Sequence, residues 1–557
     1  MRKTIIIAGA AGEGINTVEL YVEKLLKQEG YEIYAYKNYM SRVRGGYNYS
    51  TITIGQERVY STESHADIFI ALNAEAVENA SAQIKADGTL IALSGLKSKN
   101  EFEGKAIWVD EDELKNITKN KNAFGMVAVG MIIKWFGGEE SILEKINNKK
   151  WSDSINSTNK ACAKWGYEQM ESVHIPSRAD DERIILNGNQ AVALGALSAG
   201  LGFYCAYPMA PSTGIMNYLA AQEKKMNIVV EQAEDEIAAA MSAIGSASNG
   251  VRSMTGTSGG GFALMVESIG FAAVSEVPIV ICNVQRPGPA TGLPTRTEQA
   301  DLAFVVTASQ GEFARIVMAP RTVSDAYYST FRAFNLAEKY QVPVIILSDQ
   351  LLADSVQSID RFDTSSLKIQ RHLKEDFDPK YKRYDFENIS GNRKYPGLDS
   401  QTLIMTDSHV HDEYGKVTES EEMTIALKNK FLNRLEAIKK ELSAPEFYGV
   451  ENYDTLFISW GSTYGALREA VDELNSRDHE VAMISFTDVF PIRENFLEPF
   501  IRPDVRIINV EGNAMNQFGK ILRMETGVKF SHSINRYDGR PFTSAFIAEA
   551  YEVIKND

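Results

Sequence analysis

Four carboxylates stand together in the stretch "VVEQAEDEIAAAMSAIG", residues 229–245. Acid in the first turn of a helix offsets the partial positive charge of that helix end, so any of them could be a helix cap. The residues that follow, 238–245, are mostly Ala, Ser and Gly, small enough for another group to lie very close. The pattern leaves two interpretations open, a cap or a carboxylate carried into a site. The four acids are Glu231, Glu234, Asp235 and Glu236.

Three loops could share a site with this helix. They are "YPMAPST" (207–213), "GTSGGG" (256–261) and "NVQRPGPATGLPT" (283–295), and each follows a predicted strand. In an open parallel sheet, ligands bind outside the carboxyl ends of the strands. We therefore expect the three loops to border one crevice, with the start of the acidic helix facing it.

A second glycine cluster, Gly9, Gly12 and Gly14, lies between a predicted strand and a predicted helix. That context favours an anion held by backbone N–H groups, although a purely structural tight turn remains open. The spacing G-x-x-G-x-G is not the dinucleotide fingerprint, and the next strand ends in Tyr36 and Lys37 with no acid for a ribose. A nicotinamide or flavin cofactor is therefore disfavoured.

The loop "YMSRVRGGYN" (39–48) carries Arg42 and Arg44 beside Gly45 and Gly46. Two guanidinium groups on a flexible loop can grip a phosphate with paired hydrogen bonds. A solvated arginine loop without a ligand is the open alternative.

Other familiar signatures are weak or missing. His409 and His411 lie two apart in "DSHVHDEYG" without evident further ligands, so a surface turn is favoured over a metal site. The sequence contains no Walker loop and no H-E-x-x-H pair. The usual signatures of P-loop nucleotide enzymes and of H-E-x-x-H metalloenzymes are therefore absent.

The composition predicts a soluble protein of several domains. A chain of 557 residues exceeds one hydrophobic core, and the formal charge of -16 argues against nucleic acid or an anionic membrane as partner. Cys162, Cys205 and Cys282 are scattered, which excludes an iron–sulfur or zinc ligand set on this chain and fits a reducing cytoplasm. The longest apolar stretch is interrupted by Glu276 and Pro278, so no membrane span is expected.

Strand and helix patterns alternate along most of the chain, which predicts an α/β fold. We expect an α/β domain over 1–180, a second over 183–356 and a third over 451–557. The polar stretch 357–450 has weak periodicity and ends in a charged helix, and we interpret it as a connection lying on the surface.

Several segments of the sequence resemble a known protein family. The segments "YPMAPST", "EQAEDEIAAAMSAIGSASNGVRSMTGTSGGGFALMVESIG", "EVPIVICNVQRPGPATGLPTRTEQADL" and "INRYDGRPF" look like the α subunit of thiamine-diphosphate-dependent 2-oxoacid:ferredoxin oxidoreductases. The region "SRVRGGYN" resembles the γ component of that family, fused ahead of α. The resemblance implies three doubly wound α/β units: a γ-like domain, a pyrimidine-type thiamine diphosphate domain and a transketolase C-terminal-like domain.

The resemblance favours a carboxylate in a site over a helix cap for one of the four acids. In thiamine enzymes a glutamate hydrogen-bonds N1′ of the aminopyrimidine ring and so promotes loss of the thiazolium C2 proton. Glu236, nine residues before Gly245, matches that glutamate, which leaves the other three acids as caps or surface charges. The resemblance also implies cofactor contacts from Tyr207, Pro208 and Ala210.

The same resemblance assigns the substrate carboxylate to Arg286 and Thr295. The family loop reads Y-P-I-T-P, and Ala210 stands here in place of its threonine. Two alternatives stay open: Ser212 or Thr213 replaces that hydroxyl, or the substrate carboxylate relies on other donors. The γ–α fusion favours 2-oxoglutarate as substrate. Pyruvate and branched-chain 2-oxoacids remain open.

The motif that holds the diphosphate and magnesium in this superfamily, Gly-Asp-Gly with a later asparagine, is missing. A β subunit is therefore expected to supply that half of the site, Mg²⁺ and a [4Fe-4S] cluster, in a dimer of heterodimers that reduces ferredoxin. Coenzyme A is assigned to Arg42, Arg44, Gly12 and Gly14. Two further classes stay open: a Rossmann-type nicotinamide or flavin oxidoreductase, and a non-catalytic scaffold.

Overall fold

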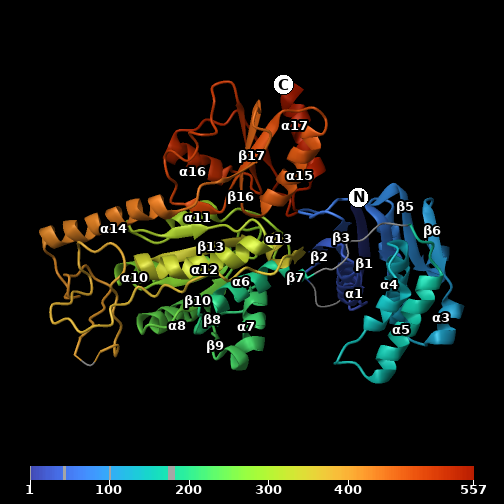
Figure 1. Cartoon of the computed structure of the whole chain (residues 1–557), viewed down its shortest axis with the longest axis horizontal. Coiled ribbons are helices and arrows are strands. Elements are labelled where there is room, and N and C mark those ends of the chain that lie inside the picture. Colours follow the sequence, from blue (N-terminus) through green and yellow to red (C-terminus); the bar gives the residue numbers. More distant parts are fainter. Residues whose placement is uncertain (1, 42–44, 100–101, 174–181, 400, 557) are drawn as a thin grey trace. The chain divides into compact units, whose positions relative to one another are not determined.

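The computed structural model describes residues 2–41, 45–99, 102–173, 182–399 and 401–556 (Figure 1). The chain divides into two compact units. The first comprises Met1–Leu186, Ser355–Arg361 and Thr543–Ala545, and the second comprises Asn187–Asp354, Phe362–Phe542 and Phe546–Asp557. Helices and strands interleave in both, which confirms the predicted α/β class.

A mixed sheet forms the centre of the first unit. Among the described residues its strand order is β6-β5-β4-β1-β3-β2-β14-β7. β1, β4, β5 and β6 run parallel, but β3 is antiparallel to both of its neighbours. The antiparallel pairing arises because β2 and β3 follow each other without the crossover helix that parallel pairing needs, so this α/β unit has a mixed sheet. The strands are β1 (Arg2–Ala11), β2 (Glu32–Asn38), β3 (Gly45–Gly55), β4 (Ala66–Ala71), β5 (Ile84–Leu93), β6 (Lys105–Val109), β7 (Ile184–Asn187) and β14 (Val356–Ile359).

Two of these strands come from beyond the expected first domain. β14 pairs antiparallel with β2, and the Ser358 hydroxyl accepts the Ile33 N–H at 2.8 Å. Arg183, just before β7, donates to the carbonyls of Gly30 and Tyr31. An unpaired edge strand exposes its backbone hydrogen-bonding groups, and β14 covers that edge of β2. The first unit therefore extends past residue 180, which the sequence pattern did not predict.

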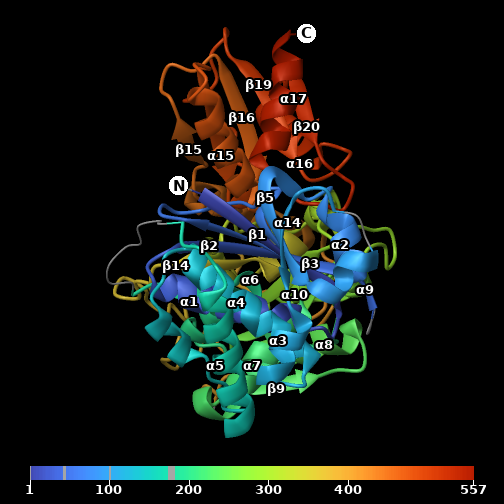
Figure 2. The same ribbon diagram turned by 90° about the vertical axis from the view of Figure 1, so that its right-hand side faces the viewer.

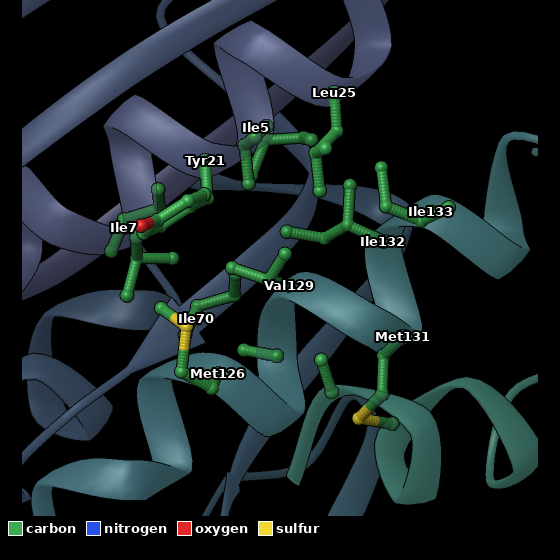
Figure 3. Close-up of a cluster of buried hydrophobic side chains, with 14 of the residues drawn as sticks. Ile5, Ile7, Tyr21, Leu25, Ile70, Met126, Val129, Met131, Ile132 and Ile133 are labelled. Carbon is green, nitrogen blue, oxygen red and sulfur yellow. The ribbon is translucent and has the colours of Figure 1, made fainter. Parts of the chain in front are cut away.

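Helices α1 and α4 pack an apolar core against the first sheet. Figure 3 shows side chains from β1 (Ile5), α1 (Leu25) and α4 (Val129, Ile132) directed into one cluster. Helices α4 and α5 also meet closely, since a Cβ on Gly130 would lie 1.8 Å from the Ala163 carbonyl oxygen. The helices of this unit are α1 (Ile15–Gln28), α2 (Ala74–Ala80), α3 (Glu111–Ile117), α4 (Phe124–Trp135) and α5 (Asp153–Glu168), with 3-10 turns at Ser94–Lys99, Lys121–Ala123 and Glu140–Lys145.

The second unit contains a parallel sheet with strand order β18-β12-β13-β11-β10-β8-β9 in the described chain. Only its edge strand β18, which comes from the C-terminal region, is antiparallel there. The strands are β8 (Phe203–Ala206), β9 (Val229–Gln232), β10 (Ser253–Thr257), β11 (Ile279–Gln285), β12 (Ile316–Met318), β13 (Pro343–Asp349) and β18 (Asp488–Phe490). The helices are α6 (Gly188–Ser198), α7 (Thr213–Met226), α8 (Glu236–Ser248), α9 (Gly259–Leu264), α10 (Val266–Val274), α11 (Leu302–Thr307), α12 (Val323–Tyr340) and α13 (Gln350–Asp354).

A third sheet, β15-β17-β16-β19-β20, completes the second unit, with α15, α16 and α17 alongside its strands (Figure 2). One hydrophobic core serves both sheets, since Ile281 and Leu347 belong to the same buried cluster as Ile458 and Trp460. The C-terminal region therefore packs directly against the second sheet. Its elements are β15 (Glu446–Gly449), β16 (Thr455–Trp460), β17 (Val481–Phe486), β19 (Arg506–Glu511), β20 (His532–Asn535), α15 (Tyr464–Asn475), α16 (Gln517–Thr526) and α17 (Ser544–Asn556), with a 3-10 turn at Gly461–Thr463.

The segment 357–450 is mostly irregular before α14 (Glu421–Glu441), but it does not simply lie on the surface. Lys430 and Arg434 are buried, and both pair with the carboxylate of Glu276, at 2.6 and 2.8 Å. Burial opposes ionisation of Glu276, yet the charges of Arg434 and Lys430 lower its pKa to about 2. The composition of this segment is polar because many of its charges meet partners inside the unit.

His411 corrects the expectation of a surface turn at 409–411. Its side chain is buried, lies against the Tyr384 ring, and its Nε2 is 3.1 Å from the Val274 carbonyl oxygen. Both ring nitrogens face backbone carbonyls, which describes a packing residue. No cluster of His, Cys, Asp or Glu that could hold a metal ion occurs among the described residues.

Candidate cofactor and substrate site

The three predicted loops leave the same edge of the second sheet. β10 pairs in parallel with β8 on one side and with β11 on the other. The loops that follow these strands begin at Tyr207, Ser258 and Arg286. The strand order also reverses at β8, since β9 and β10 lie on opposite sides of it, and ligands bind at such switch points. The expected crevice edge is therefore present.

Helix α8 separates the capping acid from the buried one. Asp235 is the N-cap residue, and its Oδ1 accepts the Ala238 N–H at 2.8 Å. Glu231 and Glu234 are exposed to solvent. Glu236, the first residue of the helix, is only 4% exposed. One acid thus serves as the cap, and its neighbour is turned into the protein.

The Glu236 carboxylate lies against the glycine turn after β10. A Cβ on Gly261 would lie 2.5 Å from Glu236 Oε1 and 2.1 Å from Thr257 Oγ1. Oε1 is fully buried, and no described residue gives it a hydrogen bond. A buried polar oxygen without a partner is costly unless a ligand supplies the donor. The carboxylate is therefore set up to accept a hydrogen bond from a bound molecule.

Arg286 lies between two of the loops. Its Nη1 donates to the Ala210 carbonyl oxygen at 2.6 Å, which ties the loop after β11 to the loop after β8. The acid whose charge acts on Arg286 is Asp301 and not Glu298, which lies nearer in sequence. Burial lowers the pKa of Arg286, and the charge of Asp301 opposes that effect. The remaining N–H groups of the guanidinium can still grip a carboxylate.

Asp301 joins this site although the sequence pattern did not single it out. Its Oδ2 accepts a hydrogen bond from Asn283 at 3.2 Å, and its carboxylate lies beside Gly259, where a Cβ would be 2.4 Å away. Burial raises the pKa of Asp301 to about 6, against lowering effects of Asn283 and Arg286. No local pattern could reveal this acid, because Gly259 stands far from it in the sequence. Two carboxylates, of Glu236 and Asp301, therefore flank one glycine turn.

The other predicted residues of the site differ in accessibility. Tyr207 and Ala210 are exposed, and Pro208 and Thr213 are half-buried. Thr295 is buried at the end of the loop that Arg286 opens. These positions lie on the loops that border the crevice edge.

Ser212 is a correction. It is 1% exposed, and its hydroxyl donates to the Met209 carbonyl at 2.8 Å. That hydroxyl is used within its own loop and is closed off from a substrate, so Ser212 does not replace the threonine that Ala210 lacks.

Comparison with known proteins identifies the family. Residues 194–429 match the family described as "Pyruvate flavodoxin/ferredoxin oxidoreductase, thiamine diP-bdg", and residues 4–169 match "Pyruvate ferredoxin/flavodoxin oxidoreductase". A 2-oxoacid:ferredoxin oxidoreductase subunit alpha from Sulfolobus sp is 33% identical, over 100% of this chain and 98% of the relative. This chain belongs to the 2-oxoacid:ferredoxin oxidoreductase α-subunit family. It is a subunit of an oxidoreductase, as the sequence resemblance predicted.

A solved structure of this family matches the whole fold. It is the 2-oxoglutarate:ferredoxin oxidoreductase from Magnetococcus marinus, with 2-oxoglutarate, coenzyme A and succinyl-CoA bound. Its TM-score to this chain is 0.91 at 30% sequence identity, and the match covers 99% of both chains. The 2-oxoglutarate synthase subunit KorA of Methanocaldococcus jannaschii is 33% identical over 56% of this chain and 84% of the relative.

The geometry around Glu236 fits the thiamine diphosphate of this 2-oxoacid:ferredoxin oxidoreductase family. An aminopyrimidine ring needs a carboxylate acceptor in a place closed to water, and Oε1 of Glu236 is a buried acceptor without a partner. The glycines at 259–261 leave backbone space beside that carboxylate, which a Cβ at 261 would fill. The residues present are therefore suited to the pyrimidine end of the cofactor.

The first unit of this family member carries the second glycine cluster. Gly12 and Gly14 have positive φ, and a Cβ on either would meet no atom of the described residues within 4 Å. The Glu13 carboxylate accepts the Ala10 N–H at 2.7 Å and a hydrogen bond from Asn73 at 2.7 Å. The turn thus has an open surface but already holds an acid. Arg42 and Arg44 lie outside the described residues.

Three cysteines occur in the described part of the chain. Cys162, Cys205 and Cys282 are buried free thiols. Among the helices that the structure describes, none combines the length and apolar character needed to cross a bilayer.

Proposed function

We propose that this chain is the γ–α fused subunit of a complex that oxidises 2-oxoglutarate. In the reaction 2-oxoglutarate and coenzyme A yield succinyl-CoA, carbon dioxide and a proton, and two electrons pass to oxidised ferredoxin. The ligands named for the Magnetococcus marinus structure and the KorA relatives support 2-oxoglutarate as substrate. The observation that carries the proposal is the buried Oε1 of Glu236, at the carboxyl edge of the second sheet, which receives no hydrogen bond from the described residues.

Glu236 is the proposed catalytic residue. Thiamine diphosphate, when bound, supplies carbanion chemistry at the carbon that carries the lost carboxylate. Oε1 of Glu236 would accept a hydrogen bond at N1′ of the aminopyrimidine and hold the proton there without competition from water. Tyr207, Pro208 and Ala210, on the neighbouring loop, are the proposed contacts to the same ring.

Arg286 and Thr295 are the proposed ligands of the substrate carboxylate, with Thr213 on the adjoining loop. Arg286 uses one N–H on Ala210 and keeps the rest of its planar fork for a second acceptor. Because that hydrogen bond also fixes the loop after β8, a substrate carboxylate on Arg286 would be held between two anchored loops.

Coenzyme A is the proposed ligand of the first unit, at Gly12, Gly14, Arg42 and Arg44. The open surface of the two glycines supports an approach by an extended molecule. A phosphate beside the Glu13 carboxylate would need cationic groups to offset the repulsion between the two negative charges. Arg42 and Arg44 are proposed to supply them.

The rest of the site is proposed to come from a β subunit. Large apolar side chains are exposed on α8, at Ile237 and Met241, and on α9, at Leu264. Ile237 and Met241 are four residues apart and so share one face of α8, which supports a contact surface there. The β subunit would bring the diphosphate half of the site, Mg²⁺ and a [4Fe-4S] cluster, in a dimer of heterodimers working in the cytoplasm with ferredoxin.

Co-purification with the β subunit tests this function. The complex should contain thiamine, measured by fluorescence after oxidation, and should reduce ferredoxin with 2-oxoglutarate only when coenzyme A is present. The isolated chain should contain little thiamine and no iron–sulfur absorbance. Turnover of pyruvate or a branched-chain 2-oxoacid in preference to 2-oxoglutarate would correct the substrate. A complex without thiamine or turnover would refute the proposal in favour of a scaffold.

A further inference from the structure

The C-terminal sheet has its own reversal of strand order. β16 pairs in parallel with β17 on one side and with β19 on the other, so the strand order reverses at β16. In open α/β sheets, ligands bind outside the carboxyl ends of the strands at such a point. Gly461 follows β16 there, and Gly512 follows β19.

The side chain of Gln299, from the loop that follows β11, occupies this position at the carboxyl ends of β16 and β19. Its Nε2 donates to the Trp460 carbonyl at 3.0 Å, and its Oε1 accepts from the Thr463 hydroxyl at 2.8 Å and from the Gly512 N–H at 2.9 Å. The residue is 2% exposed. A Cβ on Gly461 would lie 3.0 Å from its Nε2, and one on Gly512 would lie 3.1 Å from its Oε1. The two glycines make the space that the amide occupies.

The backbone around Gln299 is held by the same sheet. Its N–H donates to the Gly512 carbonyl at 2.7 Å, and its carbonyl accepts from Asn513 at 2.9 Å. Gln517 continues the contact by donating to the Ala300 carbonyl at 2.7 Å and accepting the Ala303 N–H at 2.9 Å. Every hydrogen bond in this set joins the C-terminal sheet to the chain between 299 and 303.

The C-terminal side of the contact is itself rigid. Glu511, fully buried at the end of β19, accepts from Asn513 at 2.6 Å and from the backbone N–H groups of Phe518 and Gly519. A carboxylate satisfied on both oxygens holds the start of α16 and the 511–513 turn in one arrangement. Gln299 is therefore bound to a fixed surface.

The held segment leads directly into the substrate site. Asp301 follows two residues later, and its N–H donates to Gln285 Oε1 at 3.0 Å on the last residue of β11, next to Arg286. Its carboxylate meets Asn283 and the Gly259 turn. A shift of Gln299 would move Asp301 and the end of the loop that begins at Arg286.

We propose that Gln299 is a positioning residue for 2-oxoacid binding, through which the C-terminal sheet holds the substrate loop at its own switch point. The proposal rests on the proposed function, which places the 2-oxoacid on that loop. It assigns the C-terminal sheet a role in substrate affinity in place of a separate small-molecule site.

The test uses the co-purified complex with Gln299→Met, which keeps the length of the side chain and removes the amide. Loss of one such hydrogen-bonded contact corresponds to roughly a tenfold effect. We expect the KM for the 2-oxoacid to rise about tenfold, with kcat, the KM for coenzyme A and the thiamine content little changed. Hydrogen exchange at the amides of Asp301 and Ala303 should become faster, which reports loop order without reference to turnover.

Asn475→Ala is the matched control. Asn475 makes two hydrogen bonds to the Val481 backbone inside the C-terminal sheet and does not touch the loop. It should lower the melting temperature without changing the KM for the 2-oxoacid. Thr463→Val, which removes only the donor to Gln299 Oε1, is the second variant if the methionine variant fails to assemble.

An unchanged KM and unchanged exchange in Gln299→Met and Thr463→Val would overturn the proposal and leave Gln299 as a structural contact. A wild-type complex that prefers another 2-oxoacid alters the proposed substrate but leaves this comparison valid with that compound. A wild-type complex that turns over no 2-oxoacid refutes both proposals.

Discussion

Gly261 makes room for the carboxylate of Glu236: a Cβ at position 261 would lie 2.5 Å from Oε1 and 2.6 Å from Cγ of the glutamate. The same Cβ would lie 2.1 Å from Thr257 Oγ1. Glu236 and Thr257 are both buried, so neither side chain has free space into which it could move. The glycine turn and the glutamate therefore form one arrangement, and a change in the turn should be felt at the carboxylate.

Gly261→Ala should displace Glu236 and lower the thiamine content and turnover of the complex by at least about tenfold, equivalent to roughly 1.4 kcal/mol. Gly260→Ala is the control in the same helix, since its Cβ would meet only the Ala290 carbonyl oxygen, at 4.0 Å. Alanine improves helix propensity by up to about 1 kcal/mol at both positions, so propensity cannot explain a difference. Equal activity in the two variants would contradict the assignment.

Glu236→Gln keeps the size of the side chain and removes the proton acceptor. Turnover of the 2-oxoacid should fall by about 10²–10⁴-fold, the usual contribution of a general acid–base group. Asp235→Asn neutralises the adjacent residue and keeps a good cap, so it should change stability by less than about 1 kcal/mol and leave turnover nearly intact. Steady-state kinetics and thermal unfolding distinguish the two. Survival of activity in Glu236→Gln would point to another carboxylate.

Asp301→Asn should alter how 2-oxoacid binding depends on pH. Burial raises the pKa of Asp301 to about 6, so this carboxyl gains its charge as pH rises through that value. The charged form offsets Arg286, and kcat/KM for the 2-oxoacid should therefore fall as pH rises through about 6 in the wild type. The asparagine variant should lose that inflection. A profile that keeps it would assign the titration to another group, with Glu298, whose pKa burial also raises, as the next candidate.

Arg286→Lys keeps the positive charge and loses the planar fork. A charge-assisted hydrogen bond contributes roughly 1.5–3 kcal/mol, so the KM for the 2-oxoacid should rise about ten- to a hundredfold. Lysine can still donate one hydrogen bond toward the Ala210 carbonyl, and the melting temperature should hardly move. A normal KM with a clearly lowered melting temperature would mean that Arg286 only ties the two loops together.

Glu23→Gln should remove a pH dependence from the stability of the first unit. Burial, and next the charge of Glu19, raise the pKa of Glu23 well above its usual value. The stability tied to its neutral form is present below the ordinary glutamate pKa and is lost as pH rises through the raised value. Unfolding between pH 5 and pH 9 should therefore show a smaller loss in the variant. Glu78→Gln, on an exposed position of α2, should leave the wild-type pH dependence unchanged.

Much of the candidate site could be predicted from local pattern. The acid run before a stretch of small residues marks α8, and within it Asp235 takes the cap while Glu236 turns inward, because consecutive residues at a helix start point in different directions. The three glycine-bearing loops follow strands that prove to be neighbours. Each of these features lies within a short segment, so its residue pattern can be recognised in the sequence.

The tertiary structure alone decided which distant segments meet. Asp301 reaches the glycine turn at Gly259, Gln299 enters the C-terminal sheet, and β14 completes the first sheet by pairing with β2. Lys430 and Arg434 look like surface residues in the sequence because Glu276, which pairs with both, lies on another segment. The sequence by itself indicated the family and the alternation of strands and helices, and through the family resemblance it singled out Glu236 among the four acids. The contacts around the site join segments that are far apart in the sequence. No periodicity or spacing within one segment reveals which distant segment it will meet.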